Sequence, residues 1–187
     1  MKKTIDRRSF IKRAGGSALA MTSMGALAGC GRTSGNKADK EGCPVSGEMT
    51  YRTNKANDDK VSILGYGCMR WPMIKNEEGK DIVDQDTVNA LIDHALEKGV
   101  NYFDSAPVYL QGQCESATGE ALSRHPREAY FIATKLSNFK NPDREFGLEM
   151  YRKSLEAFRT DYLDYYLLHS ISGEEAFRKR FLDNGLI

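Results

Sequence analysis

Residues 86–104, DTVNALIDHALEKGVNYFD, contain a helix pattern followed at once by a strand pattern. The apolar residues of the first part recur at the three- and four-residue spacing of a helix with one buried face. These residues are Val88, Leu91, Ile92, Ala95 and Leu96. Asp86 is the expected N-cap, Gly99 the expected residue after the C-cap, and Val100–Asp104 the expected strand. The stretch therefore predicts one helix–strand unit.

The same alternation continues on both sides of this unit. The expected strands are Val61–Leu64, Val100–Asp104, Ala129–Lys135 and Tyr162–His169, and the expected helices are Asp86–Lys98, Glu115–Ser123, Phe146–Arg159 and Glu174–Asp183. Strands that alternate with helices at this spacing are typical of parallel βαβ units with right-handed crossovers. The sequence therefore predicts an α/β fold with a parallel sheet.

Two parallel architectures compete for this pattern. A doubly wound sheet usually has a glycine-rich turn between its first strand and first helix. Here Gly65-Tyr66-Gly67 ends the first expected strand and leads into a long polar connection, Lys75–Asp86. This arrangement favours a (βα)8 TIM barrel, in which catalytic groups lie at the C-terminal ends of the strands.

Four polar side chains lie where such a barrel places its chemistry. Asp104, Lys135 and His169 each end an expected strand, and Tyr109 lies in the loop that follows the first of them. An ammonium beside a phenol stabilises the phenolate, and a carboxylate beside an ammonium keeps the ammonium charged. The set predicts a proton-donating tyrosine supported by a Lys–Asp pair, with the histidine hydrogen-bonding the same substrate oxygen. Taken singly, each residue also fits a structural role, as a loop cap, a solvated strand end, a packed ring or a hydrogen-bonded histidine.

The charge balance argues against a nucleic-acid partner. Six of the 27 basic residues and one of the 26 acidic residues lie in Met1–Cys30, which leaves 21 basic and 25 acidic side chains. This mildly acidic remainder has no polybasic face. The cysteines also show no metal-site spacing, so we expect no metal site. They are Cys30, Cys43, Cys68 and Cys114.

The first thirty residues have the pattern of a targeting segment. A basic start, DRRSFIK at residues 6–12, precedes a weakly apolar stretch that ends in LAGC at residues 27–30. The apolar stretch has about fourteen residues, whereas a membrane span needs about twenty. The segment resembles a twin-arginine signal peptide with a lipoprotein box. A surface helix with two chance arginines is the alternative.

This resemblance to a signal peptide implies where the protein goes. Residues 1–30 would direct it to the twin-arginine export machinery, and Cys30 would become the lipid-modified first residue of the mature protein. Residues 31–48 would form a polar tether. The implied location is the periplasmic side of the cell envelope, with a lipid anchor in the membrane.

The region from residue 49 onward resembles the aldo/keto reductase family. The segments that carry this resemblance are Tyr51-Arg52, GYGCMR at 65–70, NYFDSA at 101–106, Tyr109, ATK at 133–135 and LLHS at 167–170. The resemblance implies an NADPH-dependent barrel enzyme that reduces a small-molecule carbonyl compound. It implies that Asp104, Tyr109, Lys135 and His169 form the catalytic tetrad, with Tyr109 as the proton donor.

The family resemblance also implies cofactor contacts. It places Gly67, Cys68 and Met69, together with Asp104, against the nicotinamide cofactor, although a tight packed turn at residues 67–69 is the alternative. A full barrel needs about 250 residues, and residues 49–187 supply about half of that, so we expect the N-terminal half of a barrel. We expect the isolated chain to be inactive. The resemblance to exported lipoprotein members of the family also implies that any 4Fe–4S clusters would lie in a missing C-terminal region.

Two other functions fit the same sequence because a fold does not determine its function. One is a regulatory module that binds a nicotinamide cofactor without turnover. The other is an exported iron–sulfur redox protein with an incidental barrel domain. The carbonyl substrate and the preference for NADPH over NADH do not follow from the residues.

Overall fold

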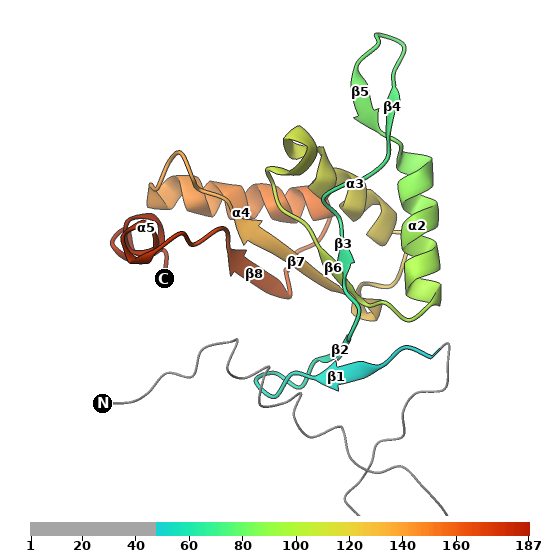
Figure 1. The fold of residues 1–187 in the computed structure, drawn as a ribbon, viewed down its shortest axis with the longest axis horizontal. Helices are drawn as coiled ribbons and strands as arrows, with labels where there is room; N and C mark the ends of the chain where they lie inside the picture. Colours follow the sequence, from blue (N-terminus) through green and yellow to red (C-terminus); the bar gives the residue numbers. More distant parts are fainter. Residues whose placement is uncertain (1–47) are drawn as a thin grey trace, which may run out of the picture. The chain divides into compact units, whose positions relative to one another are not determined.

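The computed structural model describes residues 48–187, and Figure 1 shows how their elements are arranged. The strands are β1 (Tyr51–Thr53), β2 (Lys60–Ser62), β3 (Tyr66–Gly67), β4 (Met73–Lys75), β5 (Asp81–Val83), β6 (Tyr102–Asp104), β7 (Phe131–Leu136) and β8 (Tyr165–Leu168). The helices are α2 (Gln85–Glu97), α3 (Gln113–Leu122), α4 (Arg144–Phe158) and α5 (Glu174–Phe177). Two short 3-10 turns lie at Tyr109–Gly112 and Arg127–Ala129, and a π-helical turn lies at Arg178–Leu182.

The central sheet is all-parallel and has the strand order β3-β6-β7-β8. Each neighbouring pair is joined through a helix, α2, α3 and α4 in turn (Figure 1). The order follows the chain without the reversal that marks a doubly wound sheet. The described part of the chain is therefore built as successive βα units of the barrel type.

The three long helices lie side by side along one face of this sheet. Alternate strand residues, such as Phe103 and Ile132, point into the layer between sheet and helices and are fully buried. Helices α3 and α4 approach closely at Gly119, where an added Cβ would lie 2.3 Å from the carbonyl oxygen of Ala157 and 2.5 Å from the Cα of Phe158. Only a residue without a side chain allows this contact.

Aromatic side chains gather on strand positions that alternate with the buried ones. The ring of Tyr165 lies 5.3 Å from that of Tyr102 and 6.2 Å from that of Phe131, measured between centroids. The Tyr165 hydroxyl donates a hydrogen bond of 2.7 Å to the carboxylate of Asp59, in the loop between β1 and β2. The N-terminal hairpin is thereby attached to the last strand of the sheet.

The prediction that Val61–Leu64 forms the first barrel strand is wrong. Lys60–Ser62 pairs antiparallel with β1, and the first strand of the parallel sheet is Tyr66–Gly67, inside the glycine segment expected to end the strand. Asn101 binds Ser62 in this position, because the side-chain oxygen of Asn101 accepts a hydrogen bond from the Ser62 backbone amide at 2.8 Å. The remaining apolar residues of the run, Ile63 and Leu64, are 65% and 59% exposed.

The expected N-cap of α2 is also wrong. The N-cap is Asp84 rather than Asp86, because the Asp84 carboxylate accepts from both the amide and the hydroxyl of Thr87, at 3.1 and 2.6 Å. The long polar connection before α2 joins and includes the strands of an antiparallel hairpin, β4 and β5, which projects beyond the end of α2 (Figure 1). The expected role of Gly99 after the C-cap is confirmed by its φ of +84°.

The other expected elements occur with shifted ends. Glu115–Ser123 and Phe146–Arg159 correspond to α3 and α4, and the expected strands ending at Asp104 and Lys135 correspond to β6 and β7. The last expected helix is α5 continued by the π-helical turn. The signal segment, Cys30 and most of the tether lie outside the described residues. Among residues 48–187, no helix is long and apolar enough to span a membrane.

Candidate active site

The site is built where the parallel strands end. Register pairs Gly67 of β3 with Asp104 of β6, and Asp104 with Ala133 of β7. Lys135 lies two residues beyond Ala133 on the same face of β7, and His169 follows β8 directly. Strand geometry therefore brings three of the four predicted residues to one edge of the sheet.

An ion pair lies at the centre of this edge. The Nζ of Lys135 lies 2.5 Å from Oδ1 of Asp104 and donates to the carbonyl oxygen of Ser105, also at 2.5 Å. The Lys135 side chain is only 13% exposed, and that of Asp104 is 32% exposed. Partial burial strengthens this charge-assisted contact relative to a surface pair. The ammonium is held in one position at the sheet edge.

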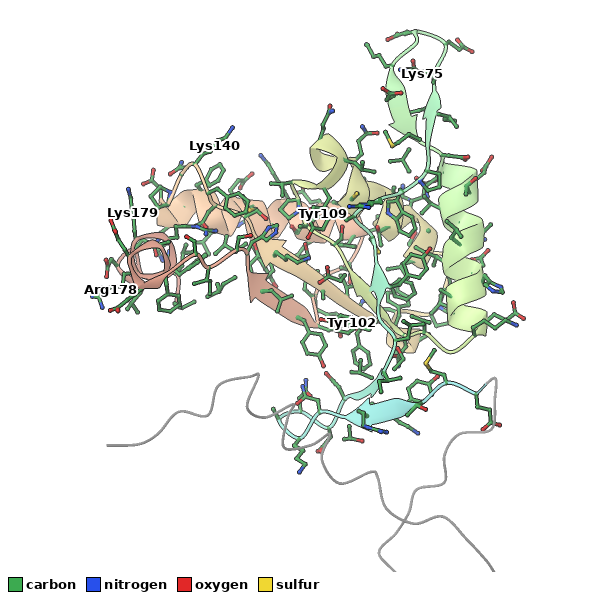
Figure 2. The ribbon with its side chains drawn as sticks, in the orientation of Figure 1. Lys75, Tyr102, Tyr109, Lys140, Arg178 and Lys179 are labelled. Carbon is green, nitrogen blue, oxygen red and sulfur yellow. The ribbon has the colours of Figure 1, made fainter. Side chains whose placement is uncertain are left out.

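Tyr109 lies next to this ammonium. It begins the 3-10 turn after β6, and its amide donates to the carbonyl of Ala106 at 3.1 Å. The Lys135 Nζ is 4.9 Å from the centre of the Tyr109 ring. The next two residues, Leu110 and Gln111, have φ values of +44° and +56°, a strained conformation for side-chain-bearing residues. Figure 2 shows Tyr109 at the end of the sheet opposite to Tyr102.

His169 completes the predicted set. Its ring meets that of Tyr109 edge-on, with centroids 5.8 Å apart, and its amide donates to the carbonyl of Leu136 at 3.2 Å. Burial lowers the pKa of His169 from its usual value, and the positive charges of Lys135 and Arg180 lower it further, against an opposing effect of Asp104. The imidazole is therefore neutral near neutral pH.

Three residues around His169 were missed by the sequence analysis. The Ser137 hydroxyl contacts the histidine Nδ1 at 2.6 Å, and the Phe139 ring lies 5.0 Å from the imidazole. Arg180 donates to the His169 carbonyl at 2.8 Å. Ser137 could have been predicted, because it lies two residues beyond Lys135 and alternate strand residues share a face of the sheet. No local pattern pointed to Arg180.

The predicted cofactor residues differ in accessibility. The side chain of Cys68 is fully buried in the core, and this burial raises the pKa of its thiol. Met69 is 42% exposed, and nothing lies within 4 Å of the position that a Cβ on Gly67 would occupy. Gly67 thus leaves open space next to Asp104, its register partner, whose carboxylate is partly exposed. Gly67, Met69 and Asp104 are therefore the residues that could touch a cofactor.

A hollow of about 490 Å³ lies beside the histidine. Phe139 and Arg180, both neighbours of His169, are among its lining residues, whereas Tyr109 and Lys135 are not. The hollow therefore lies next to the cluster of predicted site residues and does not contain it. Among residues 48–187, no group of three or more His, Cys, Asp or Glu side chains is arranged to hold a metal ion.

The described residues form successive βα units, with a Lys–Asp pair, a tyrosine and a histidine at the C-terminal edge of the strands, which is where a barrel-type protein carries its chemistry. Comparison with known proteins agrees with this class. The family model for the Aldo/keto reductase family matches residues 64–181. This chain belongs to the aldo/keto reductase family.

Individual relatives match over most of the described region. The NADP(+)-designated aldo-keto reductase yakc of Schizosaccharomyces pombe is 27% identical over 144 residues, which cover 70% of this chain and 40% of the relative. Methylglyoxal reductase YeaE of Escherichia coli is 34% identical over 119 residues, 64% of this chain and 39% of the relative. The chain therefore spans about two fifths of the length of these relatives.

A solved structure shows the same fold. The holo form of the aldo-keto reductase AKR11C1 from Bacillus halodurans superimposes with a TM-score of 0.54 at 30% identity. The match covers 71% of this chain and 46% of that structure. The likeness places the parallel sheet and its helices in a (βα)8 TIM barrel fold.

Proposed function

We propose that the complete protein is an NADPH-dependent oxidoreductase that reduces an aldehyde or ketone to an alcohol. The observation that carries this proposal is the Lys135 ammonium, paired with Asp104 at 2.5 Å and lying 4.9 Å from the Tyr109 ring centre. The NADP(+) in the name of the yeast relative and the dicarbonyl substrate in the name of the bacterial one support the cofactor and the substrate class.

Each residue then has one task. The reduced nicotinamide supplies a hydride to the carbonyl carbon when it is bound, and Gly67, Met69 and Asp104 would hold it. Tyr109 donates its hydroxyl proton to the carbonyl oxygen as negative charge develops there. The Lys135 ammonium stabilises the tyrosinate that remains. Neutral His169 hydrogen-bonds the same oxygen and orients the carbonyl.

Replacing Tyr109 tests this assignment. In the complete protein, Tyr109→Phe should lower kcat/KM for aldehyde reduction by roughly 10²–10⁴-fold, because the general acid is lost. NADPH affinity should be nearly unchanged because the ring remains. Tyr102→Phe removes the same hydroxyl at the opposite end of the sheet (Figure 2) and should leave the rate unchanged. Undiminished reduction by Tyr109→Phe would refute the proton-donor role.

Two alternatives give different readouts in the same preparation. A regulatory module would bind NADPH tightly without oxidising it in the presence of simple aldehydes. An iron–sulfur protein would show visible absorption from its clusters. The Lys–Asp–Tyr–His arrangement favours the enzyme over both, because a module that only binds has no need of a supported proton donor.

We further propose that residues 49–187 are the N-terminal half of the barrel, containing about its first four βα units. The supports are the unreversed order β3-β6-β7-β8 and the coverage of about two fifths of the relatives. The remaining units would close the sheet and complete the cofactor site. Sequencing the coding region downstream of Ile187 tests this proposal: a stop codon directly after Ile187, with no second half encoded nearby, would contradict it.

The N-terminal segment leads to a proposal about location. We propose that residues 1–30 direct export and that Cys30 carries a lipid anchor, on the pattern of Arg7-Arg8 and of LAGC at 27–30. Changing Arg7 and Arg8 to Lys should retain the protein in the cytoplasm, whereas Cys30→Ser should permit export without the anchor. Cell fractionation with lipid labelling measures both. Normal anchoring of both variants would show that the segment has another role.

A further inference from the structure

The hydroxyl of Ser137 has one proton and two neighbours that could accept it. Its Oγ lies 2.6 Å from Nδ1 of His169 and 3.3 Å from the carbonyl oxygen of Lys135. The carbonyl can only accept, whereas a neutral imidazole nitrogen either donates or accepts. The direction of the short contact therefore decides which ring nitrogen of His169 carries the proton.

The distances favour donation by the serine. A hydroxyl donor makes shorter hydrogen bonds than an N–H donor when both bind an oxygen, at about 2.7–2.8 Å against about 2.9–3.0 Å. The 2.6 Å contact is short even for a hydroxyl donor, whereas the 3.3 Å contact to Lys135 is long. The serine proton thus points at Nδ1, which leaves the histidine proton on Nε2.

The Ser137 side chain is held in place from several directions. Ser137 is 95% buried, and its amide donates to the sulfur of Met150 on α4 at 3.1 Å. The next residue, Asn138, makes two hydrogen bonds with Arg180. Its side-chain nitrogen donates to the Arg180 carbonyl at 2.8 Å, and the Arg180 guanidinium donates to the side-chain oxygen of Asn138 at 3.3 Å. The same guanidinium donates to the His169 carbonyl at 2.8 Å. Arg180 therefore binds both the segment Ser137–Asn138 and His169, and it fixes the distance between them.

We propose that Ser137 is a positioning residue that holds His169 in the tautomer with the proton on Nε2, ready to donate a hydrogen bond to the substrate carbonyl oxygen. This inference rests on the proposed carbonyl-reductase function and adds a residue to it. Among residues 48–187, Ser137 is the hydrogen-bond partner of the imidazole ring. Nε2 is therefore the nitrogen that remains for the substrate. The lowered pKa of His169 agrees with a neutral ring.

Nitrogen-15 NMR of the complete protein tests the tautomer directly. The ring signals of His169 are assigned by their loss in the His169→Gln variant. At about pH 7.5, above the usual histidine pKa, we expect a proton-bearing signal for Nε2 of His169 and a bare-nitrogen signal for Nδ1. A proton on Nδ1 in the unmodified protein would overturn the inference, whatever the activity of the enzyme.

Kinetics of Ser137 variants add a second readout. Ser137→Ala should lower kcat/KM roughly three- to tenfold, the loss expected for one hydrogen bond, with the NADPH dissociation constant unchanged. Ser137→Thr keeps the hydroxyl and should restore most of the rate, and Ser116→Ala, on the exposed side of α3, is the matched control. An unchanged rate and tautomer in Ser137→Ala would refute the positioning role. Absence of carbonyl reduction by the unmodified enzyme would instead refute the proposed function, and the NMR result would still stand.

Discussion

Replacing Gly119 with alanine offers a test in which helix propensity and packing predict opposite changes in stability. Alanine is about 1 kcal/mol more favourable than glycine in a helix interior, so Gly119→Ala in α3 would stabilise an isolated helix. In the structure the added Cβ would lie 2.3 Å from the Ala157 oxygen and 2.5 Å from the Phe158 Cα, whereas ordinary contacts begin at 3.4 Å. Both obstacles are backbone atoms of the α4 C-terminal turn, so no side-chain rotation relieves the overlap.

The helices must therefore separate by about 1 Å, the difference between 2.3 and 3.4 Å. Overpacking of a core typically costs about 1–3 kcal/mol, and overlap with rigid backbone lies at the upper end. After the propensity gain, we expect a net destabilisation of about 1–2 kcal/mol. For a domain of this size that lowers Tm by about 2–8 °C.

Thermal unfolding of the complete protein, followed by circular dichroism, measures the effect. Gly173→Ala is the matched control, because its backbone is extended and nothing lies within 4 Å of the added Cβ. Surface changes of this kind usually alter stability by less than about 0.5 kcal/mol. A Tm for Gly119→Ala equal to or above that of the unmodified protein would refute the close approach of α3 and α4.

Two further predictions concern His169 and the isolated chain. Burial lowers the pKa of His169 in the folded state, so the unfolded state binds more protons and stability should fall as the pH drops below about 6.5. Unfolding curves recorded across this pH range should show a smaller decline in stability for His169→Gln. Identical pH dependence of the two proteins would contradict this prediction. Residues 31–187 expressed alone should self-associate and bind NADPH weakly, because β3 and β8 are edge strands of the described sheet and Leu167 is 40% exposed. Size-exclusion chromatography with NADPH titration checks this, and a monomer that binds tightly would disprove it.

That Asp104, Lys135 and His169 come together could be predicted from the sequence because their positions follow local rules. Each lies at or next to the end of a strand, and parallel strands bring their C-terminal ends to one edge of the sheet. Tyr109 follows β6 closely, so its neighbourhood was constrained too. The contact of Arg180 with His169, in contrast, depends on how the chain after β8 returns to the sheet, which no periodicity encodes.

The errors in the predicted fold have similar physical origins. An apolar run such as Val61–Leu64 has the same pattern in a hairpin and in a barrel. Its pairing with β1 and the bond between Ser62 and Asn101 involve partners outside the run, so periodicity does not predict them. Asp84 and Asp86 are equally good capping residues by type. The position of the Thr87 amide decided between them.

The hydrogen bond between Asp59 and Tyr165 has a consequence for the order of folding. It joins residues 106 positions apart in the chain, farther than the contacts between successive strands of the sheet. Closing so long a loop is entropically costly before the intervening units have ordered. We expect this bond to form late, after β8 has joined β7, whereas the contact between Ser62 and Asn101 spans 39 positions and can form earlier. The loop that carries Asp59 would then be attached to the sheet in two separate steps.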